Sequence, residues 1–170
     1  MKIKLRNWTM NDANGLVQVI NNKKIHNNLR DGFPFPYTLD DARNYIEMTL
    51  ESDTSKSFVY AIVNEQDTIL GNIGVFRQEN IHYRTAEMGY FIGEQYWGNG
   101  VATQAVLEIC QKIFCATDII RIFAEPFARN AASCRVLEKA GFSREGVLKM
   151  NAYKNGQFED MCLYALINEL

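Results

Sequence analysis

The stretch "QYWGNGVATQAV", residues 95–106, places two glycines one residue apart immediately before a run that is typical of a helix. Glycine adopts backbone conformations that other residues avoid, and it lets a ligand come close to the main chain. The first N–H groups of a helix have no intrahelical partner and lie at the positive end of its dipole. Such a turn can bind an anion, although the same pattern also suits a plain connection between a strand and a helix.

Two common phosphate-binding motifs are excluded at this turn. A P-loop requires G-K-[ST] after the glycines, and that sequence does not follow. The dinucleotide fingerprint needs a third glycine and a preceding βαβ unit, and both are missing.

The rest of the chain alternates between β-rich runs and amphipathic segments. Thr9 and Thr38 each begin a T-x-x-D pattern, which is a helix start with a capping box, and Asn155-Gly156 is a hairpin turn. We predict helices from Thr9, from Thr38 to about Ser52, at 101–116 and at 130–142, with Asn130 as the N-cap of the last and Gly141 past its end. We predict strands at 2–8, 57–63, 69–76, 85–92, 119–125, 143–153 and 157–166, with 57–63 and 69–76 forming an antiparallel hairpin.

The apolar positions of these helices predict which faces are buried. They are Ala13, Leu16, Val19 and Ile20 in the first, Ala42, Ile46 and Leu50 in the second, and Ala102, Val106, Ile109 and Ile113 in the third.

Composition bounds the class of protein. The 170 residues are 47% hydrophobic and 22% charged with a net charge of −2, which predicts one globular domain over residues 1–170 and argues against an extensive nucleic-acid surface. The four cysteines form no CxxC pair and have no histidine at ligand spacing, so we expect buried thiols of a reducing cytosol and no metal. Without a secretory h-region or an apolar run of about 20 residues, we expect a cytoplasmic protein that does not cross a membrane.

Two motifs together carry a resemblance to a known family. Gln95-Tyr96-Trp97-Gly98-Asn99-Gly100 resembles Q/R-x-x-G-x-G/A, the acetyl-CoA pyrophosphate motif of the GCN5-related N-acetyltransferase (GNAT) superfamily. "NAASCRVLEKAGF", residues 130–142, resembles its second cofactor motif, and "RDGFPFPYTLDDARNYI", residues 30–46, is similar to the branch that includes ribosomal-protein N-terminal acetyltransferases.

The resemblance implies a fold and a reaction. The fold is a mixed α/β one with a mostly antiparallel sheet of six to seven strands, a splayed central strand pair and about four flanking helices. The reaction is direct acetyl transfer from acetyl-CoA, without a metal, to a primary amine of a protein N-terminus or a small molecule. A non-catalytic acyl-CoA-binding module of the same fold is the alternative, and either a monomer or a homodimer is compatible.

The resemblance also implies a cofactor site. Strands 85–92 and 119–125 would splay, and the pantetheine arm would pair in the gap with backbone groups of Phe91, Ile92 and Gly93, where ordinary sheet pairing is the alternative. An N–H near Tyr90 or Phe91 would polarise the thioester carbonyl. Asn130 would cap its helix and contact the cofactor. The pyrophosphate would be bound by the turn, through Gln95, Gly98, Asn99, Gly100, Val101, Ala102 and Thr103.

Two residues, Glu87 and Ser133, are candidates for a catalytic role. Glu87 is an acid in an apolar strand, and it is either the general base for the amine or a surface acid paired with Arg84 or Arg121. Ser133 is either a proton donor to the departing thiolate, as proposed in this branch, or a serine bonded to its own backbone. Some relatives have a glutamate before the last hairpin where this chain has Ala152, which argues against specificity for ribosomal proteins.

The aromatic loop at 30–38 has two readings. Phe33, Phe35 and Tyr37 either wall the amine pocket or plug one end of the core. His26 and His82 are isolated, and we expect them to be solvated.

Overall fold

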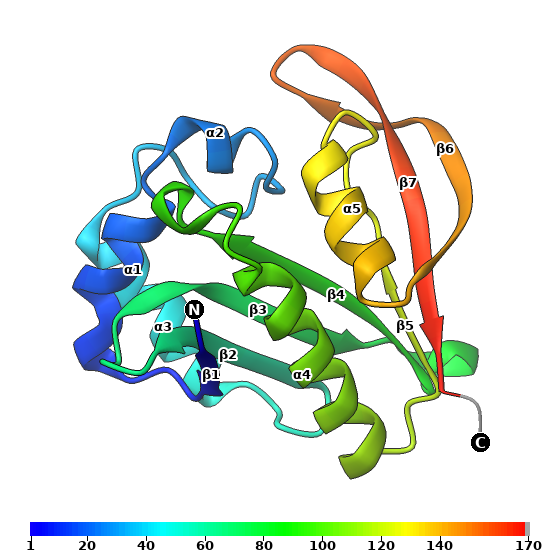
Figure 1. Cartoon of the computed structure of the whole chain (residues 1–170). Coiled ribbons are helices and arrows are strands. Elements are labelled where there is room, and N and C mark those ends of the chain that lie inside the picture. Colours follow the sequence, from blue (N-terminus) through cyan, green and yellow to red (C-terminus); the bar gives the residue numbers. More distant parts are fainter. Residues whose placement is uncertain (169–170) are drawn as a thin grey trace.

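The computed structural model, which describes residues 1–168, contains a seven-stranded sheet in the order β1-β2-β3-β4-β5-β7-β6 (Figure 1). All neighbouring strands are antiparallel except β4 and β5, which are parallel. The predicted hairpins are confirmed, and the last one turns at Asn155 and Gly156, with φ of 52° and 79°. The strands are β1 (Ile3–Arg6), β2 (Ser57–Asn64), β3 (Ile69–Arg77), β4 (Thr85–Ile92), β5 (Arg121–Ala124), β6 (Ser143–Lys154) and β7 (Gln157–Ile167).

Helices cover both faces of the sheet. One hydrophobic cluster joins α4 and α5 to one face, and a second joins α1 and α3 to the other. Strand β4 serves both clusters, because Met88 and Ile92 pack in the first and Phe91 in the second, as its alternating pattern predicts. The helices are α1 (Ala13–Ile20), α2 (Lys23–His26), α3 (Leu39–Glu51), α4 (Val101–Ala116) and α5 (Ala131–Lys139).

The capping signals read from the sequence are present. At both Thr9 and Thr38 a capping box forms with the aspartate three residues on, and Thr38 Oγ1 accepts a hydrogen bond from the Asp41 amide at 3.1 Å. Asn130 caps α5 by accepting from the Ser133 amide at 3.2 Å. These side chains satisfy backbone donors that a helix start leaves free.

Strands β4 and β5 are paired at their N-terminal ends and then separate. Strand β4 pairs with β5 only at Thr85↔Arg121, Ala86↔Ile122 and Glu87↔Phe123, whereas it pairs with β3 along its whole length. Beyond Glu87 the two ribbons diverge, with α5 beside the opening (Figure 1). This is the splayed pair that the family resemblance implies, and we call the space between Met88–Ile92 and the end of β5 the gap.

Some local expectations were wrong. The segment after Thr9 begins with one 3₁₀ turn, Met10–Asp12, before α1, and the four-residue helix α2 was missed. Leu50 is 52% exposed and Cys115 is exposed, because both lie toward the ends of helices where the sheet no longer covers them. Ala102 and Cys134 are half-buried. Within residues 1–168, none of the helices is both long and apolar enough to span a bilayer.

Candidate functional site

The glycine turn connects β4 to α4. Gly98 and Gly100 have φ of +77° and +74°, in the left-handed region that favours glycine, and Gly100 is the N-cap of α4. The first amide that the helix itself satisfies is that of Gln104, which donates to the Gly100 carbonyl at 3.0 Å. The amides of Val101, Ala102 and Thr103 therefore precede the hydrogen-bonded ladder, at the positive end of the helix dipole.

The turn leaves room for a ligand against its main chain. A Cβ added at Gly98 would meet no atom within 4 Å, and one at Gly100 only Gln104 Nε2 at 3.7 Å. The space beside both glycines is therefore open in the structure. Open space beside the first amides of a helix is what the binding of an anion requires.

The polar side chains of the turn contact the turn itself. Asn99 Nδ2 donates to the carbonyls of Tyr96 and Trp97 at 3.3 and 3.2 Å, and Gln95 lies over Gly93, where an added Cβ would meet its Oε1 at 3.1 Å. Asn99 therefore stabilises the loop in the structure.

Hydrogen-bond directions along β4 decide which backbone groups face the gap. The Gly93 amide donates to Leu70 of β3 at 2.8 Å, and the Arg84 carbonyl accepts from Ile120, beside β5, at 2.9 Å. Because peptide groups alternate along a strand and the β3–β4 register has no shift, Phe91 and Gly93 point toward β3. The gap-facing groups belong to Met88, Tyr90 and Ile92. Of the three residues expected to pair with the pantetheine arm, only Ile92 has backbone groups on the side of the gap.

One gap-facing backbone group, and one at the end of the strand, are already engaged. The Ile92 carbonyl accepts from the Trp97 indole at 2.7 Å, and the Gly93 carbonyl accepts from the Tyr96 amide at 2.9 Å. The gap therefore offers an extended ligand mainly the peptide groups of Met88 and Tyr90 and the Ile92 amide.

On the α4–α5 face of the gap, two hydroxyls meet. Tyr90 Oη lies 2.9 Å from Ser133 Oγ and 3.4 Å from the Ser133 carbonyl. Burial raises the pKa of Tyr90 to about 12, although its hydrogen bond to Ser133 acts in the opposite direction. Ser133 is therefore in contact with a side chain of β4, and this partner was not foreseen.

On the opposite face, two carboxylates share one guanidinium. Arg30 forms a direct ion pair with Glu87, and its Nη2 lies 3.8 Å from Glu125 Oε2. Glu125 follows β5 directly, so the two acids stand on the two splayed strands, and both side chains are about three-quarters buried. The expected partners of Glu87 were wrong, because Arg121 pairs with Glu145 and Arg84 with Asp118.

Glu125 has the environment of a proton acceptor. Burial raises its pKa above the ordinary glutamate value, the nearby charge of Glu87 raises it further, and Arg30 partly offsets both. A carboxyl group with a raised pKa binds a proton more readily near neutral pH.

The aromatic loop divides between core and surface. Tyr37 is 3% exposed and its hydroxyl donates to the Asp41 carbonyl at 3.3 Å, so it is a core residue. Phe33 is half-buried, with its ring centroid 5.9 Å from that of Phe91. Phe35 is 42% exposed and lies beside the His26 ring, whose Nε2 is 3.1 Å from the Phe33 carbonyl. His26 is thus tied to the loop instead of being simply solvated.

The segment that leads into this loop is joined to the last hairpin. Lys154 Nζ lies 2.7 Å from Asp31 Oδ1, and Asn155 Nδ2 donates to Asn27 Oδ1 at 3.2 Å. Arg129 donates to Asn28 and to the Asn27 carbonyl, each at 2.7 Å. We call this set of contacts the clamp. It links residues 27–31 to the β6–β7 turn and to the loop before α5.

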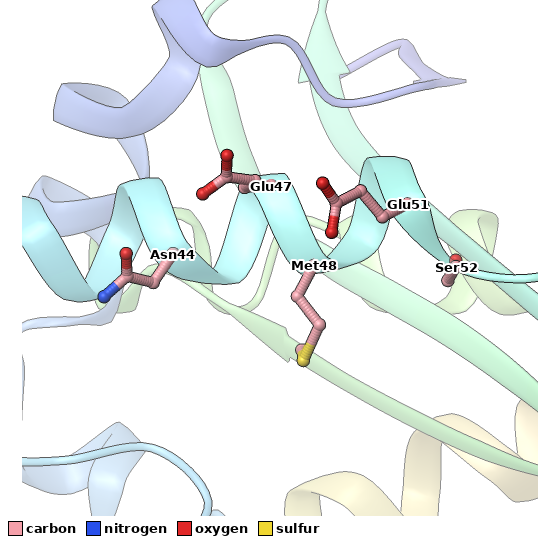
Figure 2. Close-up of a pocket in the computed structure, with 5 residues that line it drawn as sticks. All are labelled: Asn44, Glu47, Met48, Glu51 and Ser52. Atoms are coloured by element: carbon pink, nitrogen blue, oxygen red, sulfur yellow. The ribbon is translucent and has the colours of Figure 1, made fainter.

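A separate pocket lies on α3, away from the gap and the glycine turn. It is lined by Asn44, Glu47, Met48, Glu51 and Ser52, which all come from α3 and its C-cap (Figure 2). It contains none of the residues of the gap or the turn. Within residues 1–168, no group of three or more histidine, cysteine or acidic residues is placed to hold a metal.

Comparison with known families decides the class of this site. The family model described as "Acetyltransferase (GNAT) domain" matches residues 2–143. The chain belongs to the GNAT acetyltransferase family. Among curated relatives of this GNAT protein, the probable N-acetyltransferase YjcK of Bacillus subtilis is 33% identical over 135 residues, covering 78% of this chain and 74% of YjcK.

Solved structures share the fold of this GNAT protein. The ribosomal-protein-S5-alanine acetyltransferase of Vibrio fischeri superposes with a TM-score of 0.87 at 23% identity, covering 99% of this chain and 94% of that one. The spermidine N-acetyltransferase of Vibrio cholerae, solved with CoA and spermine, gives a TM-score of 0.82 at 20% identity and covers 98% of this chain and 95% of the other.

Two features of the GNAT site were missed by sequence reasoning. Glu125 and Arg30 lie 95 positions apart, and Tyr90 and Ser133 lie 43 apart, so only the fold brings each pair together. The one usable signal was that Glu125 ends an apolar strand next to the strand of Glu87.

Proposed function

We propose that this GNAT protein transfers the acetyl group of acetyl-CoA directly to a primary amine. The observation that carries the proposal is the gap, which has hydroxyls on one face and carboxylates on the other. Cosubstrate and acceptor can therefore approach the same point from opposite sides of the sheet, with no covalent enzyme intermediate required.

Binding of acetyl-CoA would use main-chain groups. The amides of the turn from Gly98 to Thr103 would hold the pyrophosphate, and the gap-facing groups of Met88, Tyr90 and Ile92 would pair with the pantetheine arm. The bound cosubstrate supplies the activated acyl group. Asn130 would support this site by fixing the start of α5.

The amine would be deprotonated on the other face. The neutral amine is the nucleophile, so a carboxylate must accept a proton directly or through water. Glu87 is held in an ion pair with Arg30, whereas Glu125 is farther from the guanidinium and has a raised pKa. In this proposal Glu125 accepts the proton of the amine. Glu87 positions Arg30 and raises the pKa of Glu125. Ser133 faces the sulfur side of the gap.

The acceptor belongs to the class of primary amines, either a protein N-terminus or a small molecule. The V. fischeri and V. cholerae enzymes are named for one of each kind. Phe33 and Phe35 would wall the amine side of the gap, since Tyr37 is buried in the core. A cytoplasmic location and a monomer or homodimer remain predictions.

The test combines calorimetry with acetyl-CoA and thiol release over a panel of peptide N-termini, polyamines, amino acids and aminosugars. We expect binding, and turnover on at least one amine. Binding without turnover on any amine would instead favour a non-catalytic acyl-CoA-binding module.

Gly100→Val tests the turn. Valine at a φ of +74° is strained and its branches enter the ligand's space, so we expect loss of acetyl-CoA binding in a protein that still folds. Gly146→Val is the matched control, because a Cβ at Gly146 meets nothing within 4 Å and its φ lies outside the left-handed region. Wild-type affinity in folded Gly100→Val would refute the pyrophosphate assignment.

A further inference from the structure

Ser133 is bonded differently from two threonines of the helices, Thr49 and Thr117. Thr49 donates to the Tyr45 carbonyl at 2.8 Å, and Thr117, which caps α4, donates to the Ile113 carbonyl at 2.9 Å. In each case the hydroxyl proton is used by the preceding helical turn, as is usual. Ser133 lies in the first turn of α5, and its Oγ meets the phenol of Tyr90 from another element.

Either hydroxyl can donate this hydrogen bond, and the environment of Tyr90 favours the tyrosine as the donor. Burial keeps its phenol protonated at neutral pH, with a pKa of about 12, so Tyr90 carries a proton that needs an acceptor. Ser133 Oγ at 2.9 Å is a better acceptor position than the Ser133 carbonyl at 3.4 Å, which is near the limit for a hydrogen bond. If Tyr90 donates to Oγ, the single proton of Ser133 is free to point into the gap.

We propose that Tyr90 is a positioning residue that turns the Ser133 hydroxyl toward the sulfur of the cosubstrate, so that Ser133 stabilises the leaving thiolate as a hydrogen-bond donor. This inference rests on the proposed function of the gap. No proton need leave either hydroxyl, and the thiolate is protonated later by water. A hydroxyl with a pKa far above that of a thiol, about 8.5, is a poor acid toward it but a good donor.

The first experiment uses binding alone. Calorimetry compares CoA with desulfo-CoA, which lacks the thiol, between pH 7 and 9.5. A donated hydrogen bond favours the thiolate, so the affinity of CoA relative to desulfo-CoA should rise about tenfold with pH in the wild type, equivalent to a bound-thiol pKa about one unit lower. We expect this rise to disappear in Tyr90→Phe and in Ser133→Ala.

Tyr164→Phe is the matched control. Tyr164 is also a buried tyrosine whose hydroxyl contacts α5, at 3.1 Å from Glu138 Oε1. If the Tyr90 hydroxyl merely anchors α5, the two tyrosine variants should behave alike. We expect Tyr164→Phe to keep the wild-type pH dependence, and equal loss in both variants would overturn the inference.

The second experiment is a double-mutant cycle on turnover. Tyr90→Phe and Ser133→Ala should each lower kcat about tenfold with little change in the KM for acetyl-CoA, and the double variant should be no slower than Ser133→Ala alone. Multiplying effects would show that Tyr90 does not act through Ser133 and would overturn the inference. An inactive wild type with a normal thiolate effect would defeat the proposed transfer but leave the hydroxyl pair supported.

Discussion

At the scale of single residues, the two glutamates of the gap have different expected roles, although both are about three-quarters buried and share Arg30. Glu125→Gln removes the proposed proton acceptor, so kcat should fall about 10²–10⁴-fold at neutral pH. The loss should shrink at high pH, where the amine deprotonates without help. A pH–rate profile of kcat/KM measures both effects.

Glu87→Gln should act on the pH profile instead. A base works when deprotonated, so activity falls as the pH drops through its pKa. Removing the negative charge of Glu87 lowers the raised pKa of Glu125, and the acidic limb should therefore move to lower pH. A large loss at all pH values in Glu87→Gln, with Glu125→Gln near wild type, would return the base role to Glu87.

At the scale of elements, local signals predicted the helices and strands well because their causes are local. The T-x-x-D patterns at Thr9 and Thr38 mark real capping boxes, and Asn155-Gly156 adopts the positive φ values of a tight turn. The helix α2 was missed because its four residues, "KKIH", carry only one buried side chain, Ile25, and no helical periodicity.

Contacts between elements could not be read in the same way. The backbone groups of Met88, Tyr90 and Ile92 face the gap because alternate peptide groups of β4 point toward opposite neighbouring strands. Which set faces the gap depends on which strand lies on each side of β4. A shift of one residue exchanges the two sets of peptide groups. The sequence therefore located the strand beside the gap but placed the backbone groups of Phe91 and Gly93 on the wrong side of it.

The aromatic loop gives the prediction at this scale. Phe35→Ala should raise the KM for the amine about fivefold or more and leave the Kd of acetyl-CoA unchanged, because Phe35 is 42% exposed and its ring lies beside that of His26. Tyr37→Ala should instead lower the free energy of unfolding by about 3–5 kcal/mol, since it empties a buried aromatic site. Kinetics and thermal unfolding of both variants separate the roles, and destabilisation by Phe35→Ala would make the loop purely structural.

At the scale of the whole molecule, the clamp connects parts of the chain that the sheet does not. The ammonium of Lys154, whose side chain is only 5% exposed, contacts Asp31 at the start of the aromatic loop, and it comes from the far end of the chain. Hydrogen bonding to Lys154 lowers the pKa of Asp31 below its ordinary value. The contact therefore contributes to stability above the unfolded pKa and is lost only as the pH falls through the lower, folded value.

Lys154→Met should loosen the amine side of the gap without unfolding the sheet. Methionine keeps most of the apolar stem of lysine but carries no charge. Residues 27–31 therefore lose their ion pair with the last hairpin, while the turn at Gly98–Gly100 is unchanged. We expect faster amide hydrogen exchange in residues 27–37 and an amine KM raised about fivefold or more, with the Kd of acetyl-CoA unchanged. Lys149→Met is the control, because Lys149 pairs with Asp160 at 2.7 Å within the same hairpin and is 77% exposed. Equal effects of the two variants would mean that hairpin stability, and not the clamp, sets amine binding, whereas an effect of Lys154→Met alone would show that the last hairpin orders the acceptor wall.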